Sequence, residues 1–112
     1  MKVILNNFEP LSVNKCWQGR RFKTKEYNEW RNGLEYLLPK KKIIEGEVEV
    51  NIKFWIKSYK RCDVDNFAKP FLDSLVNKQY IEDDRKIIKL TLEKFQSIKP
   101  RIELEIKPYE KM

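Results

Sequence analysis

Residues 47–57 alternate strictly between apolar and polar side chains, and this run constrains the fold more than any other part of the chain. Because successive side chains of a β-strand point to opposite faces, the alternation predicts a strand with one buried face. The side chains expected on that face are Val48, Val50, Ile52, Phe54 and Ile56. Trp55 falls on the polar face, where a large aromatic ring favours a subunit contact or a base-stacking position.

Three further strands are expected from shorter runs of the same kind. Residues 2–7 place Val3 and Leu5 on one face. A strand over residues 85–95 is expected to turn Ile88, Leu90 and Leu92 inward, and a last strand to turn Ile102, Leu104 and Ile106 inward. Because residues 97–100 form a short connection, we expect the last two strands to pair as an antiparallel hairpin.

Two amphipathic helices separate these strands. The first is predicted over residues 25–38, with Thr24 as its N-cap and Pro39 ending it. Its expected core side is Tyr27, Trp30, Leu34, Leu37 and Leu38. The second begins near Asn66, with an Asp or Asn as N-cap, so that Pro70 lies near the first turn. Its apolar stripe is Phe67, Ala68, Phe71, Leu72, Leu75 and Val76.

The predicted order of elements is therefore β-α-β-α-β-β. One-sided strands and two amphipathic helices indicate an α/β (α+β) fold in two layers, with a mixed sheet of about four strands. The length of 112 residues predicts a single domain over residues 1–112. The exposed sheet face or the first helix is expected to pair two subunits.

The amino-acid composition limits the types of partner and of catalytic site that this chain can have. Lys and Arg outnumber Asp and Glu by 24 to 17, which gives a net charge of +7 and favours a polyanionic partner. Histidine is absent, and this excludes a Ser-His-Asp triad, a histidine base and imidazole-bound zinc. The two cysteines lack CxxC spacing, which favours reduced thiols and a cytoplasmic location, and no apolar stretch approaches the length of a membrane span.

Acidic residues are concentrated between residues 63 and 84 of this basic chain. In an extended segment Asp63 and Asp65 point to the same side, and Asp83 and Asp84 precede a strand. Two carboxylates about 4 Å apart repel by roughly 4 kcal/mol at an effective dielectric constant of 20, whereas a carboxylate at a helix N-terminus gains only about 0.3–1 kcal/mol. If these groups converge, they require a cation, and all-oxygen ligation suits Mg²⁺ or Mn²⁺. If they do not converge, they are helix caps and turn residues.

Basic residues gather in two loops. The loop up to residue 23 mixes cations and an amide with Trp17 and Phe22, a composition typical of a phosphate-binding surface and also of an ordinary exposed loop with one aromatic anchor. The candidate DNA-binding residues are Asn14, Lys15, Arg20, Arg21, Lys23, Lys60 and Arg61. Lys60 and Arg61 directly precede the acidic pair and can hold phosphates that flank a cleaved bond. The run at residues 40–42 is either a solvated helix end or a contact to a DNA arm.

The run Asp63-x-Asp65-Asn66-x-x-Lys69-x-x-x-Asp73-x-Leu75, followed by Asp83-Asp84, resembles the signature of the RusA family of Holliday-junction resolvases. The resemblance extends upstream to Pro10, Asn14, Arg20 and Arg21. It implies a homodimeric, Mg²⁺-dependent endonuclease that nicks four-way DNA junctions symmetrically in recombination and repair. It also implies that Asp63, Asp65 and Asp84 bind the metal and that Lys69 is essential.

The remaining acidic motif residues have supporting roles in this hypothesis. Asp83 orients the metal ligands, and Asp73 tethers Lys69 or Asn66. Asp73 is equally interpreted as an ordinary i, i+4 partner of Lys69 on a helix surface. Two other classes of protein compete: a basic DNA- or RNA-binding module with structural acidic caps, and, more weakly, a phosphatase that uses Asp-x-Asp.

Overall fold

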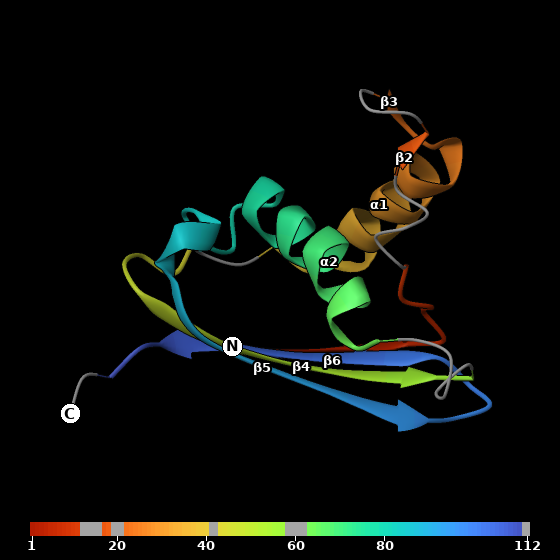
Figure 1. The fold of residues 1–112 in the computed structure, drawn as a ribbon. Helices are drawn as coiled ribbons and strands as arrows, with labels where there is room; N and C mark the ends of the chain where they lie inside the picture. The colour runs from red at the N-terminus through yellow and green to blue at the C-terminus, as the bar shows by residue number, and fades with distance from the viewer. Residues whose placement is uncertain (12–16, 19–21, 41–42, 58–62, 111–112) are drawn as a thin grey trace.

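In the computed structural model, residues 1–11, 17–18, 22–40, 43–57 and 63–110 are described. They form two layers: both long helices lie on one face of a four-stranded sheet, and no helix of the described residues covers the other face (Figure 1). The order of the principal elements is the predicted β-α-β-α-β-β. Neither of the two long helices in the described ranges has the length and apolar character needed to cross a bilayer.

The sheet order is β1-β6-β4-β5. Its strands are β1 (Lys2–Asn6), β4 (Val48–Ile56), β5 (Ile87–Gln96) and β6 (Arg101–Pro108). Strand β4 pairs in parallel with β5 and antiparallel with β6, and β6 pairs antiparallel with β1. A parallel pair requires a crossover connection, and α2 (Asp65–Asn77) forms most of it here.

The predicted hairpin of the last two strands is wrong, because β4 lies between them. The connection over residues 97–100 passes the end of β4, where the Ser97 amide donates to the Ile56 carbonyl at 3.0 Å. A connection of this length can span two strand spacings as well as one. Because β4 pairs with a strand on each side, its backbone N–H and C=O groups form hydrogen bonds. Such pairing is required where a strand is buried away from water.

The inner face of β4 is confirmed in full: the five predicted side chains are at most 5% exposed. The predicted inward residues of β1 and β6 are also buried. The prediction for β5 is wrong in part, because Ile88 is 44% and Leu90 is 40% exposed. Strand β5 is an edge strand, and a register shift opposite Val48 and Glu49 interrupts its alternation.

Helix α1 (Lys25–Leu37) begins as predicted, since the Tyr27 amide donates to Thr24 Oγ1 at 3.0 Å. Tyr27, Leu34 and Leu38 are buried, but Leu37 is 49% exposed and does not belong to the core. A short ribbon of β2 (Trp17–Gln18) and β3 (Phe22–Lys23) precedes α1, where only a loop was expected (Figure 1).

Helix α2 begins one residue before Asn66, and no side chain caps it. The predicted Asp or Asn cap is therefore wrong: Val64 is the N-cap, and the Asn66 amide instead donates to the Asp63 carbonyl at 3.1 Å. The apolar stripe packs on the sheet, where Phe54 contacts Phe67 and Phe71 with ring centroids 5.5 and 6.3 Å apart. The stripe is buried as predicted, except that Val76 is only half-buried.

Trp55 lies on the sheet face opposite the helices, and it packs between its two cross-strand neighbours. Its ring stacks on Phe95 of β5 at 4.8 Å, and the Arg101 guanidinium of β6 lies 5.2 Å from the ring centroid. These neighbours leave the ring half-buried within its own chain.

Candidate active site

Lys69 of α2 is the centre of the charged cluster. Its Nζ lies 3.0 Å from Asp73 Oδ1 and 3.6 Å from Asp84 Oδ2. Asp73 is one helical turn further along α2, so the predicted i, i+4 pair is confirmed. Asp84 belongs to η3, a short 3₁₀ helix (Asp84–Lys86) that leads into β5. The fold thus brings together two acids of the motif around its lysine.

The two carboxylates determine the charge state of Lys69. The hydrogen bond to Asp73 raises the pKa of the ammonium above its usual value. Desolvation opposes this rise, and the negative charges of Asp73 and Asp84 add to it. Lys69 is therefore a permanent cation at neutral pH. Its side chain remains 59% exposed, so it is accessible to a ligand from solvent.

The tandem aspartates have different environments. Asp83 is the N-cap of η3: its Oδ1 accepts from the Arg85 amide at 2.9 Å, and its Oδ2 pairs with Arg85 Nη2 at 3.2 Å. These contacts and the neighbouring Asp84 side chain, with the Arg85 amide contributing most, lower the pKa of Asp83 to about 2. Asp83 thus fixes the short helix, while Asp84 contacts Lys69.

Asp63 and Asp65 lie at the start of α2, and both are exposed. The predicted extended geometry between them is wrong, because Val64 has helical dihedral angles of −61° and −33°. Asp65 instead lies one turn before Lys69 on the same stripe of the helix. Among the described residues, no three Asp, Glu or Cys side chains are grouped closely enough to hold one ion. The ligand set of Asp63, Asp65 and Asp84 stays a prediction.

The motif that contains these residues matches a known family. Residues 10–107 match the family described as Endodeoxyribonuclease RusA. The chain belongs to the RusA family. The match covers most of the chain, including Pro10 and the whole acidic motif, so the resemblance seen in the sequence is confirmed. No curated protein matches the chain. The RusA family comprises endodeoxyribonucleases that act on branched DNA at Holliday junctions.

The donors of the RusA motif have the chemistry expected for a hard cation. Asp63, Asp65 and Asp84 offer carboxylate oxygens alone, the ligand type preferred by Mg²⁺ and Mn²⁺. All three are exposed, so an ion can reach each of them from solvent. The chemistry of the donor set therefore fits a divalent cation.

A hollow of about 390 Å³ lies beside this cluster, between the two helices and η3. It is lined by Tyr27, Arg31, Asp73, Val76, Asn77, Asp83 and Asp84. Arg31 was not among the sequence-predicted site residues of this RusA-family protein. Its i, i+4 spacing from Glu35 was a visible signal, but such pairs are common on helix surfaces.

Most of the predicted DNA-binding residues lie outside the described ranges. These are Asn14, Lys15, Arg20, Arg21, Lys60 and Arg61, together with Lys41 and Lys42 of the run after α1. Lys23 lies in β3, but its side chain is not described. Asn66 is half-buried in the first turn of α2, and Asp73 pairs with Lys69 as the first of its two predicted partners.

Proposed function

We propose that this RusA-family protein is a Mg²⁺-dependent endonuclease that resolves Holliday junctions by paired symmetric nicks in DNA recombination and repair. The observation that carries the proposal is the contact of Lys69 with Asp84, which unites two separate parts of the RusA motif at one surface. The substrate is a four-way DNA junction, and the acting form is a homodimer.

Asp63, Asp65 and Asp84 would hold one or two Mg²⁺ ions, for which Mn²⁺ is a possible substitute. When bound, the metal activates a water molecule and neutralises charge on the phosphate and the leaving oxygen. Asp84 contributes to this ligand set from η3, whereas Asp63 and Asp65 contribute from the start of α2. Three carboxylates from two parts of the chain would then hold the metal at one phosphodiester.

Lys69 supplies positive charge to the phosphate that is cleaved. Its ammonium is protonated at neutral pH, exposed, and held by Asp73 from the next turn of α2. A fixed cation stabilises the additional negative charge that the phosphate develops in the transition state. Asp83 acts indirectly, since its contacts with Arg85 hold η3 and hence the backbone that carries Asp84.

Polar and basic residues of two loops bind the DNA arms in this proposal. Asn14, Lys15, Arg20 and Arg21 contact backbone phosphates from the loop before α1, together with Lys23. Lys60 and Arg61 contact the phosphates that flank the cleaved bond. The excess of positive charge supports a binding free energy that depends strongly on salt concentration.

Two-fold symmetry relates the proposed dimer to its substrate. A four-way junction has approximate two-fold symmetry, so a C2 dimer presents one acidic site to each of two equivalent strands. The uncovered sheet face and α1 are the surfaces available for pairing the subunits.

The test uses end-labelled synthetic junctions and linear duplex, each incubated with the protein and either Mg²⁺ or EDTA. We expect paired nicks at symmetric positions of the junction only with Mg²⁺. Asp63→Asn and Asp65→Asn should retain junction binding and lose cleavage. Binding without any metal-dependent nicking would instead support a non-catalytic DNA- or RNA-binding module, and unchanged nicking in both variants would refute the proposed metal ligands.

A further inference from the structure

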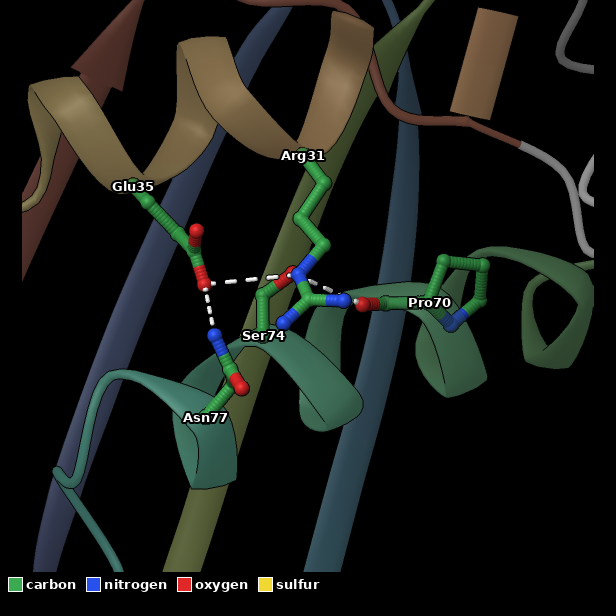
Figure 2. Close-up of polar contacts among 5 residues, drawn as sticks. All are labelled: Arg31, Glu35, Pro70, Ser74 and Asn77. Atoms are coloured by element: carbon green, nitrogen blue, oxygen red, sulfur yellow. Dashed lines mark hydrogen bonds and ion pairs between the residues drawn. The ribbon is translucent and has the colours of Figure 1, made fainter. Parts of the chain in front are cut away.

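Arg31 lies in the second turn of α1, at the boundary between α1 and α2. Its side chain is 28% exposed and extends toward α2 (Figure 2). The guanidinium Nε lies 3.4 Å from Glu35 Oε1, one turn further along the same helix. Arg31 is thus a half-buried cation whose side chain is held by Glu35 and points toward α2.

Glu35 is itself held from the other helix. The Asn77 side-chain amide at the end of α2 donates to the same Glu35 oxygen at 2.6 Å (Figure 2). The Glu35 carboxylate therefore links α1 to α2 and fixes the Arg31 side chain between them. The Arg31 side chain has therefore already lost part of its rotamer entropy in the free protein. Less entropy remains to be lost when it binds a ligand.

The free end of the guanidinium is suited to a phosphate. Among the described residues, Glu35 is the ion-pair partner of Arg31, and it contacts Nε. The two terminal amino groups are therefore left for a ligand. Two parallel N–H donors match the oxygen atoms of a phosphate, and this geometry distinguishes arginine from lysine.

Arg31 is the one cation among the described residues that line the hollow beside Asp73, Asp83 and Asp84. Two other described cations contact these aspartates, and both are already paired: Lys69 with Asp73 and Asp84, and Arg85 with Asp83. A DNA strand that approaches the acidic cluster meets repulsion from the carboxylates. A half-buried guanidinium at the same hollow counters this repulsion for one phosphate.

We propose that Arg31 is a positioning residue that binds a backbone phosphate of the DNA strand beside the acidic cluster, with Glu35 and Asn77 holding its guanidinium in place. The inference rests on the proposed nuclease function and adds a named phosphate contact from α1. A misplacement of the reacting group by about 1 Å can reduce a rate about 10²-fold. Arg31 therefore affects the cleavage rate more than the total affinity for DNA.

The first measurement is single-turnover cleavage of a junction by saturating enzyme with Mg²⁺. We expect Arg31→Gln to cleave about 10²-fold more slowly than the unmodified protein. Arg31→Lys, which keeps the charge without the fork, should be intermediate. The matched control is Lys25→Gln, because Lys25 is a cation of the same helix with its own i, i+4 acid, Glu29, at 3.8 Å. The cleavage rate of this control should stay within about 2-fold of that of the unmodified protein.

The second measurement is the salt dependence of junction binding in EDTA, which needs no catalysis. Loss of one phosphate contact should reduce the slope of log K against log salt by about 0.9. We expect this reduction in Arg31→Gln, whereas Arg31→Lys and Lys25→Gln should keep the original slope, since the first keeps the charge and the second changes a cation that is expected not to contact DNA. If Arg31→Gln fails to fold, Arg31→Met, which also removes the charge, replaces it. Glu35→Gln should slow cleavage by about 3- to 10-fold through loss of the positioning contact.

Equal salt slopes in folded Arg31→Gln and Lys25→Gln would overturn the inference, as would equal cleavage rates. Complete absence of cleavage by the unmodified protein would refute the proposed nuclease function alone. The salt slopes would still decide whether Arg31 contacts a phosphate.

Discussion

Lys69 Nζ lies 3.6 Å from Asp84 Oδ2, although the two residues belong to different elements, α2 and η3. The parallel pairing of β4 with β5 produces this contact, because it requires α2 to return the chain along the sheet before β5 begins. Asp73, at 3.0 Å, holds the same ammonium from within the helix. Three charged residues of the RusA motif therefore meet at one end of one crossover unit.

Asparagine substitutions at Asp83 and Asp84 should have very different effects on the rate of junction cleavage. We expect Asp84→Asn to reduce junction cleavage at least about 10²-fold, because a metal ligand and the partner of Lys69 are lost. Asp83→Asn is the matched control, since an asparagine side chain can still accept from the Arg85 amide as an N-cap. It should cleave within about 3-fold of the unmodified protein. Equal losses in both variants would contradict the assigned division of roles.

Lys69→Met should reduce cleavage by about 10²- to 10³-fold, the range expected when one charge-stabilising donor is removed. Junction binding, measured by gel shift in EDTA, should change by only a few fold. Asp73→Asn should have the smaller effect on the rate, because Asp84 still contacts Lys69. A variant without Asp73 that is as inactive as Lys69→Met would show that Asp73 itself takes part in the chemistry.

The raised pKa of Lys69 predicts how cleavage depends on pH. The pKa lies above the usual value of 10.5, so the ammonium and its ion pairs are fully present below that pH and are lost only as the pH rises through the raised value. Between about pH 6 and pH 9 the charge of Lys69 should not change. Rate profiles over this range should therefore coincide in shape for the unmodified protein and Lys69→Arg. A fall in rate near pH 8 that Lys69→Arg removes would contradict this prediction.

The lowered pKa of Asp83 predicts a dependence of stability on pH. Because its folded-state pKa is about 2 and its usual value is 3.8, the ionised group stabilises the fold above about pH 4, and this contribution is lost as the pH falls through 2. Urea unfolding should show Asp83→Asn to be less stable than the unmodified protein at pH 5 to 8. The difference should shrink between about pH 4 and pH 2. A constant difference over that interval would rule out a stabilising charge on Asp83.

Thr24→Ala should lower the free energy of unfolding by about 1 kcal/mol, because the Tyr27 amide loses the hydroxyl that it donates to. Thr24→Ser keeps a hydroxyl at the same position and should retain most of the stability. Urea denaturation of the two variants at one pH provides the comparison. Equal stabilities of the alanine and serine variants would show that the cap contributes nothing to the fold.

Local patterns predicted the faces of most elements. The period of two in residues 47–57 gave the buried face of β4, and the i, i+4 spacing gave the pair of Lys69 and Asp73. Both follow from the geometry of a single strand or helix, so no distant residue is needed to infer them. The same reasoning failed at Leu90, since the burial of an edge strand depends on which elements cover it.

The acidic motif was visible in the sequence, but the position of Arg31 was not. Arg31 and Glu35 have the spacing of an ordinary surface ion pair, and only the packing of α1 against α2 places Asn77 on Glu35. The hairpin predicted for the last two strands failed for a related reason, because a short connection does not specify whether a third strand lies between them.

The sequence by itself determined the RusA motif, the two-layer α+β class, the N-cap of α1 and the inward side chains of β4. The tertiary structure alone decided that β4 separates β5 from β6, that Asp84 contacts Lys69, and that Arg31 lines the same hollow as three aspartates. The physical reason is that side-chain periodicity follows from the backbone of one element. The order of strands and the contacts between elements depend instead on hydrogen bonding and packing between residues far apart in the chain.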